Sequence, residues 1–463
     1  MSYQTAALKW TIFHFSATVN IIVRLIILYF AVLTSTLFGK QILIVQDTTR
    51  ANVDSLYRVE NVMIVGNSET KDFVILREMT LKRGEYITEK LIAYDQSRIY
   101  SLGLFNRVII HVLPVSETGA DLVVEVNERW YIFPFPIFGV RDRDWKKVYW
   151  GGGILHSNFR GRNEKLYATF TLGYDPSAAM AYRNPFVSMD GSYQFEGRFA
   201  YDKIRNRSII AQEGGENFSE EHLSLVLSLG KRFGINHMLW FSGGSEMVRV
   251  SEYLPGRTIY SSGKDLFPYF AVNYTYDSRD LYEYPAMGTF LRFGIKKFGF
   301  PGNAIDMVRY TTDFRHYLPI YSKLVLTGRL FSDFAAAGRT PSYNRVYLGY
   351  TERIRGHFKE VREGENLFGI SSELHYPLFG PVYYSADYLP AEFGIMKFGI
   401  VAAAFADAGT VWFRNEPFAL NTFSKGYGIG IHLLLPYSIV LRIDYAWNEV
   451  RRGEFILDLG TSF

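Results

Sequence analysis

The chain has 463 residues, of which 48% are hydrophobic, and this composition excludes an intrinsically disordered protein. Fifty Lys and Arg against 46 Asp and Glu leave a net charge of +4, which gives no electrostatic argument for a nucleic-acid partner. The absence of Cys excludes disulfides, thiolate catalysis and cysteine-based zinc sites. The 33 Tyr, 37 Phe, 7 Trp and 40 Gly favour a membrane β-barrel with aromatic girdles.

The N-terminal segment predicts export. Basic residues precede the apolar stretch 25–38, which ends among small residues, so residues 1–45 are interpreted as a secretory signal. A polar linker follows at 46–56. The alternative is a membrane-anchor helix over residues 12–38, although Arg24 interrupts that stretch.

Residues 57–129 predict a small α+β domain. The expected elements, in chain order, are a strand at 59–65, a helix capped by Ser68, a second helix capped by Thr88, and strands at 107–113 and 122–127. This β-α-α-β-β order predicts an antiparallel or mixed sheet with two helices.

The rest of the chain, residues 130–463, alternates between apolar and polar side chains over short segments. In one of them Leu441 and Ile443 alternate with Arg442 and Asp444. A soluble sandwich also alternates, but no helix is expected here to cover a sheet. A sheet in lipid must pair every backbone group, so we expect a closed barrel with a polar interior. At about 10 residues per strand, the length allows about sixteen antiparallel strands.

Several stretches match one known family. In the small domain they are residues 59–66, the turn at Gly84, the run 102–105 and the closing pair 128–129. In the barrel they are Ile354, Arg355 and Gly356, then Phe405, Asp407 and Gly409, the turns at 158–163 and 277–280, and the end of the chain from Phe455 to Phe463. Together they resemble the bacterial surface antigen superfamily of POTRA-plus-barrel outer-membrane translocases (BamA/TamA-like), with a single POTRA (polypeptide-transport-associated) repeat.

The resemblance implies that Arg355 lies on a lid loop and reaches back into the barrel lumen. Its implied partner is Asp407, which shares one strand face with Phe405 and Gly409 because side chains alternate along a strand. A carboxylate and a guanidinium in a crowded lumen can form a bidentate pair that fixes the loop. The family usually has Phe or Tyr after the glycine, and this chain has His357 there.

The first barrel strand contains an anomaly at Pro134 and Pro136, which have no amide donors. Alternate residues of a strand direct their amides toward the same neighbour, so both missing donors fall on one edge. That edge would meet the last strand, 454–463. We therefore expect a seam with missing hydrogen bonds, the physical requirement for a lateral gate. The alternative is a strand that starts only after Pro136.

No catalytic constellation emerges from the sequence. The nine histidines are scattered, and HExxH and GxSxG are absent, so neither an enzyme nor a metal or other cofactor is expected. Asp407 could be imagined as a catalytic acid, but beside Arg355 a structural pair is the favoured interpretation.

The predicted fold class is an α+β POTRA-like domain at 57–129 followed by an all-β transmembrane barrel of sixteen antiparallel strands at 130–463. The resemblance implies an outer-membrane protein of a Gram-negative bacterium with its POTRA domain in the periplasm. The implied function is assembly, insertion or translocation of polypeptides. Two alternatives remain: a non-insertase scaffold or pore subunit of a larger envelope complex, and a secretion transporter for one dedicated substrate.

The resemblance also implies particular partners. They are outer-membrane lipid, unfolded or nascent outer-membrane protein clients, and periplasmic or lipoprotein partners of the POTRA domain, with no nucleic acid among them. Phe455, Gly460 and Phe463 look like the terminal β-signal that outer-membrane barrels present to their assembly machinery.

Overall fold

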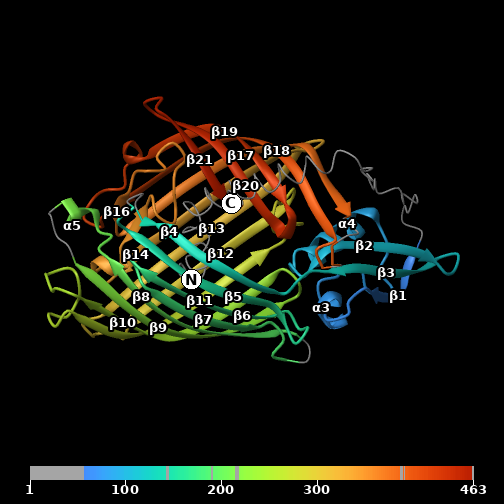
Figure 1. Cartoon of the computed structure of the whole chain (residues 1–463), viewed down its shortest axis with the longest axis horizontal. Coiled ribbons are helices and arrows are strands. Elements are labelled where there is room, and N and C mark those ends of the chain that lie inside the picture. Colours follow the sequence, from blue (N-terminus) through green and yellow to red (C-terminus); the bar gives the residue numbers. More distant parts are fainter. Residues whose placement is uncertain are drawn as a thin grey trace.

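The computed structural model describes residues 57–141, 145–188, 191–213, 218–385, 389–390 and 392–460. A small domain lies against one end of a long barrel built of strands (Figure 1). We call the barrel end next to this domain the proximal end and the opposite end the distal end. The predicted signal, the linker and Phe463 lie outside the described residues. Within these ranges no helix is both long and apolar enough to cross a membrane.

The small domain has the element order that its sequence predicts. Its elements are β1 (Arg58–Val65), α3 (Asp72–Leu76), α4 (Glu89–Tyr100), β2 (Phe105–Pro114) and β3 (Gly119–Glu128). The strand order is β1-β3-β2, with β1 parallel and β2 antiparallel to β3, so the sheet is mixed.

The two helices begin differently from one another. Thr88 caps α4 as predicted, because its side chain accepts a hydrogen bond from the amide of Leu91. The prediction for Ser68 was wrong: α3 begins at Asp72, and Ser68 Oγ donates to Glu128 at 2.8 Å. Glu128 also accepts the amide of Thr70 at 2.6 Å, so this carboxylate satisfies donors of the turn and delays the helix.

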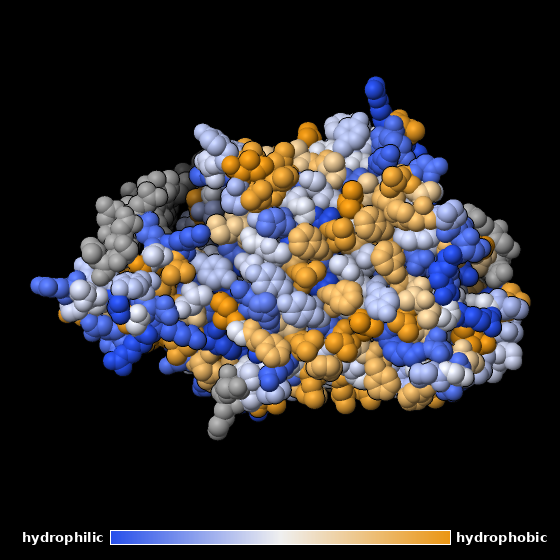
Figure 2. Space-filling view, turned by 180° about the vertical axis from the view of Figure 1, so that it is seen from behind, coloured by the Kyte–Doolittle hydropathy of each residue, from blue (hydrophilic) through white to orange (hydrophobic). Residues whose placement is uncertain are grey.

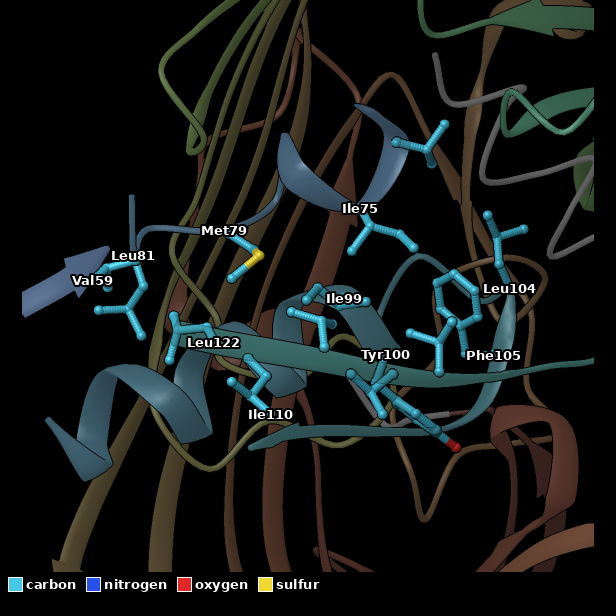
Figure 3. Close-up of a cluster of buried hydrophobic side chains, with 14 of the residues drawn as sticks. Val59, Ile75, Met79, Leu81, Ile99, Tyr100, Leu104, Phe105, Ile110 and Leu122 are labelled. Atoms are coloured by element: carbon cyan, nitrogen blue, oxygen red, sulfur yellow. The ribbon is translucent and has the colours of Figure 1, made fainter. Parts of the chain in front are cut away.

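The core of the small domain contains apolar side chains from all five of its elements (Figure 3). Val59, Ile75, Ile99 and Leu122 are each essentially inaccessible to solvent. Full burial of one such side chain contributes about 1.5–3 kcal/mol. Phe186, from a barrel turn, is buried in the same cluster, so the core of the small domain continues into the barrel.

Sixteen strands of the described residues form a single antiparallel sheet, which runs in the order β21-β20-β19-β18-β17-β14-β13-β12-β11-β10-β9-β8-β7-β6-β5-β4. The strands are β4 (Ile132–Val140), β5 (Val148–Phe159), β6 (Glu164–Gly173), β7 (Ser177–Asn184), β8 (Tyr193–Arg205), β9 (Ser219–Phe233), β10 (His237–Val250), β11 (Lys264–Asp277), β12 (Gly288–Gly299), β13 (Asp306–Tyr321), β14 (Leu324–Ala337), β17 (Asn366–Ser385), β18 (Ile395–Trp412), β19 (Ser424–Leu435), β20 (Ile439–Asn448) and β21 (Gly453–Leu459). The strand count therefore agrees with the prediction.

In the part of the barrel region that the structure describes, helical structure is limited to short segments of the connections. They are α5 (Ile209–Glu213), η2 (Ser342–Asn344), η3 (Leu420–Thr422) and η4 (Pro436–Ser438). None of them is long enough to cover a face of the sheet, as the sequence predicts.

The sheet curls so that its two end strands reach the same side of the barrel (Figure 1). At the proximal end the ring of Phe133, on β4, lies 5.7 Å from that of Tyr437, in the turn between β19 and β20. The ring of Trp130 likewise stacks 6.1 Å from that of Phe393, just before β18. These contacts join the start of the sheet to its end.

The alternation along each strand places apolar side chains outside and polar ones inside. On β9, Leu225, Leu227 and Leu229 are each more than half exposed, whereas Ser228 and His222 are buried on the inner face. Apolar side chains cover much of the barrel surface in Figure 2. This arrangement is the opposite of a soluble sandwich, which buries its apolar faces, and it is the pattern of a barrel in lipid.

Candidate functional site

The connection between β14 and β17, residues 338–365, folds back into the barrel, and we call it the lid loop. It contains a short hairpin of β15 (Val346–Leu348) and β16 (Arg362–Gly364). Its middle is buried: Ile354 packs with Leu348 and with Phe331 of the barrel wall. The motif predicted at 354–356 therefore lies inside the lumen.

Arg355 is the centre of a buried charged cluster. Its Nε and Nη2 atoms donate to the two carboxylate oxygens of Asp407 at 2.6 and 2.8 Å. Nη1 donates to Glu373 and lies 3.7 Å from a carboxylate oxygen of Asp444. The guanidinium also stacks on the ring of Phe405, 3.5 Å from its centre. One cation thus faces three carboxylates and an aromatic ring.

This cluster joins the lid loop to three strands of the wall. Asp407 lies on β18, Glu373 on β17 and Asp444 on β20. All three carboxylates are at most 5% exposed. The guanidinium is the cation that they share, and His375 also contacts Glu373 while His432 contacts Asp444. Removing one partner of such a buried group leaves the others unpaired, which costs about 3–5 kcal/mol.

The lid loop has room because the facing strand carries glycines. On the inner face of β19, a Cβ at Gly426 would lie 1.6 Å from the carbonyl oxygen of Arg355. A Cβ at Gly430 would lie 2.0 Å from a carboxylate oxygen of Asp444, and one at Gly428 would meet the ring of Phe405 at 2.6 Å. Gly426 therefore allows close approach of the loop to the wall, and Gly428 and Gly430 leave space for the wall residues around Arg355.

The structure brings the predicted pair together with residues that the sequence analysis missed. Phe405 and Asp407 both lie on the inner face, and Gly409 approaches Ile354, whose Cδ1 atom would be 2.9 Å from an added Cβ. The missed residues are Glu373, Asp444 and the glycines of β19. The alternation of glycine with large apolar residues along β19 was the available signal, because inner-face glycines in a strand mark a close approach.

The sheet has two unpaired edges, and we call the region between them the seam. In the described residues β4 has a ladder only with β5, β21 has one only with β20, and none joins β4 to β21. The amide of Arg141 donates to Lys147, and that of Ser157 to the carbonyl of Tyr131, so odd-numbered residues of the first strand bond to its neighbour. Pro134 and Pro136 therefore have their nitrogens on the free edge. Because β4 begins at Ile132, the alternative of a strand starting after Pro136 is wrong.

The end of the chain lies on the other side of the seam. Phe455, on β21, is 64% exposed on the outer face. Gly460 follows the strand with a φ of +104°, which suits glycine, and its amide donates to the carbonyl of Val440 at 2.7 Å. Phe463, the third residue of the predicted terminal signal, lies outside the described part of the chain.

The small domain is joined to the proximal end by a buried ion cluster around Glu78. Arg232, near the end of β9, donates to both oxygens of this carboxylate at 2.5 and 2.8 Å. Arg98, on α4, donates to it at 2.8 Å. Burial would raise the pKa of Glu78, but hydrogen bonds and charge from Arg232 together with the charge of Arg98 lower it to about 2.

Further hydrogen bonds connect the small domain to other proximal turns. They join Lys71 to Gly161, Arg77 to Pro185, Arg98 to Ile235, Ser101 to Tyr282 and Asn106 to Glu392. The turn at 158–163, which the sequence analysis singled out, therefore contacts the domain directly. The domain covers the proximal end of the barrel.

An apolar exterior, a charged interior, a lid loop fixed inside and a small α+β domain at one end define a transmembrane β-barrel with an attached domain. Residues 158–463 match the model of the Omp85 superfamily domain, and residues 57–129 match the POTRA model, described as a surface antigen variable number repeat. The chain belongs to the Omp85 superfamily. Its barrel spans the outer membrane and its POTRA domain is periplasmic, so the proximal end is the periplasmic end.

Curated relatives include proteins described as outer membrane protein assembly factor BamA. The one from Nitratidesulfovibrio vulgaris is 23% identical over 65% of this chain and 37% of its own length. The one from Neorickettsia risticii is 26% identical over 53% of this chain and 33% of its own length. The chain thus spans about a third of the length of these relatives.

Solved structures share the fold. BamA from Haemophilus ducreyi lacking POTRA domains 1–3 is similar with a TM-score of 0.51 and 17% identity, over 87% of this chain and 83% of that one. CdiB from Escherichia coli gives a TM-score of 0.54 and 12% identity, over 88% and 75% of the two chains. At these identities the likeness concerns the fold alone.

Proposed function

We propose that this chain assembles, inserts or translocates polypeptides at the outer membrane, and that the seam between β4 and β21 receives them. The seam carries the proposal, because both strands present backbone groups without a partner strand among the described residues. In lipid such groups have no water to bond, so pairing with an incoming strand is favourable. The name of the curated relatives, outer membrane protein assembly factor, agrees with this role.

The prolines weaken closure of the seam in particular. With Pro134 and Pro136 on the free edge of β4, two donors that could bond to β21 are missing. Each hydrogen bond that cannot form costs the closed seam about 1 kcal/mol. An incoming strand can therefore compete with β21 for this edge. The energy comes from client folding, so we infer a non-enzymatic protein without nucleotide, metal or other cofactor.

The POTRA domain is the proposed docking site for clients or partners. Its three-stranded sheet has β1 and β2 at its edges, and an extended segment can add to such an edge by β-augmentation. We propose unfolded or nascent outer-membrane proteins as clients, outer-membrane lipid around the barrel, and periplasmic or lipoprotein partners of the domain. The domain limits follow the sequence: a signal at 1–45, a linker at 46–56, the POTRA domain at 57–129 and the barrel at 130–463.

Depletion of the protein from cells tests this function. We expect a general loss of many outer-membrane barrels, measured by quantitative proteomics of the outer-membrane fraction. Loss of a single exported protein would instead support a dedicated secretion transporter. Unchanged barrel levels would support a scaffold or pore subunit, and either of these outcomes contradicts the proposal.

Complementation in the depleted cells makes the test specific to the site. The variant Arg355→Ala removes the centre of the charged cluster, and it should fail to restore barrel levels. Arg339→Ala is the matched control, because Arg339 is an exposed arginine of the same lid loop. Full rescue by both variants would show that the cluster is not needed for the activity.

A further inference from the structure

The tip of the lid loop reaches the last strand through one carboxylate. The backbone amides of Gly356 and Phe358 both donate to Oε1 of Glu454, at 2.9 and 2.7 Å. Glu454 is the second residue of β21. Two amide donors on a single charged oxygen make a stronger contact than two neutral hydrogen bonds.

Apolar contacts reinforce this connection. Phe358 packs against a buried cluster of Phe405, Ala446 and Ile456. Ile456 follows Glu454 by two residues, so both side chains lie on the inner face of β21. Gly356 has a φ of +98°, and a Cβ there would lie 2.8 Å from the carbonyl oxygen of Trp447. Only a glycine therefore lets the tip lie this close to the wall.

The strand that receives these contacts is otherwise held on one edge only. The amide of Gly460 bonds to β20, so the even-numbered residues of β21 direct their backbone groups toward β20. Those of Gly453, Phe455, Leu457 and Leu459 face the seam, where the described residues form no ladder. A second charged contact of the inner face of β21 joins Asp458 to Arg442 at 2.6 Å. The lid tip is thus a major support of this strand from inside the barrel.

We propose that Glu454 is a positioning residue that couples the lid loop to β21, so that withdrawal of the lid tip and release of the last strand are one event. This inference rests on the proposed function, since it states how the seam is controlled. Coupling between two elements is reciprocal, so loosening either one must loosen the other. The lid loop then acts as the latch of the seam, and the cluster at Arg355 holds the loop in its latched position.

Hydrogen exchange on the purified full chain in detergent micelles tests the coupling. In Glu454→Ala, the lid tip loses the acceptor of two amides, and β21 loses its inner contact. We expect exchange to rise by about tenfold, both in peptides covering 354–360 and in peptides covering 453–460. Asp458→Ala is the matched control: it removes an inward carboxylate of the same strand that does not contact the lid, so the lid peptide should be unchanged.

Two further variants separate coupling from a general loss of structure. Glu454→Gln keeps an acceptor oxygen and should restore most of the protection of the lid tip. Phe358→Ala leaves β21 unaltered in sequence, yet it should raise exchange in 453–460. Unchanged exchange of the lid tip in Glu454→Ala, or of β21 in Phe358→Ala, would overturn the proposal. Neither result depends on client assembly, so failure here is distinct from failure of the depletion test.

Discussion

The barrel has two joints of very different construction. At the periplasmic end, the POTRA domain is joined to the turns by hydrogen bonds at several points, by a shared apolar core through Phe186, and by the buried cluster at Glu78. At the seam, β4 and β21 share no ladder among the described residues, and two prolines remove donors. Contacts are thus concentrated at the domain joint, and they are few at the seam, where the proposed function requires a strand to separate.

The difference shows that the weak joint depends on support from elsewhere. The seam has no ladder of its own among the described residues, and of its two strands β21 is contacted from inside by the lid loop. The domain joint needs no such support. Variants that weaken the lid should therefore affect the seam and leave the domain joint intact, and variants at the domain joint should do the reverse.

The largest effect is expected for Arg355→Ala. This change removes the guanidinium that Asp407, Glu373 and Asp444 share, and the loss of one partner from such a buried cluster costs about 3–5 kcal/mol. The barrel should lose its resistance to SDS at lower temperature, measured as heat-modifiable mobility on gels. Binding of partners to the POTRA domain should be unchanged. Normal heat-modifiability together with normal activity would argue against the lid-loop assignment.

Glu78→Gln should loosen the domain joint by about 2–3 kcal/mol, since charged hydrogen bonds to Arg232 and Arg98 are lost. Limited proteolysis between domain and barrel should become faster, while Glu117→Gln, an exposed site on the same domain, should have no effect.

The contribution of Glu78 should also depend on pH in a defined direction. Its pKa is lowered from 4.5 to about 2, so the stabilisation is complete above 4.5 and is lost as the pH falls toward 2. The difference in proteolysis between the wild-type chain and Glu78→Gln should disappear over this range. A difference that persists at pH 2 would contradict the assigned role of the carboxylate.

Strengthening the seam should raise the stability of the barrel, and this effect should be smaller than the losses expected for the variants above. The double variant Pro134→Val and Pro136→Val restores two donors on the edge of β4, and it should stabilise the closed seam by about 2 kcal/mol. We expect higher thermal stability and slower barrel assembly in cells. Pro301→Val, in an exposed turn, is the control. Unchanged stability would mean that the prolines do not limit closure.

The smallest effect is expected at His357, which lies between Glu360 and Glu449 at 2.8 and 2.7 Å. Although partial burial lowers it, hydrogen bonds and charge from both carboxylates raise the pKa of His357 above 6.5. The stabilisation is therefore present below pH 6.5 and is lost as the pH rises through the raised value. The thermal stability difference between the wild-type chain and His357→Asn should be below about 1 kcal/mol and should vanish at alkaline pH.

Much of the architecture could be predicted from the sequence because it follows from local patterns. The alternation of apolar and polar residues predicted the barrel strands. The capping side chain of Thr88 predicted the start of α4. The prediction that Ser68 caps the first helix was wrong because its hydroxyl donates to Glu128, sixty residues away in the chain. Capping rules describe local competition and do not include such distant acceptors.

The cluster was predictable only in part for the same reason. Arg355 and Asp407 belong to motifs, whereas Glu373 and Asp444 become their neighbours through strand register and barrel curvature. Glu454 was expected only as the start of the last strand. Its contact with the amides of Gly356 and Phe358 depends on the path of a long loop, which no periodicity encodes.

The glycines at 426, 428 and 430 carry a consequence for engineering. Gly426 leaves space for the backbone of Arg355, and Gly428 and Gly430 leave space for Phe405 and Asp444, which contact Arg355, so this part of the wall is shaped for this loop. A lid grafted from another barrel would meet a wall shaped for a different chain. A chimera with a lid loop from another barrel should therefore also carry the β19 strand of that barrel.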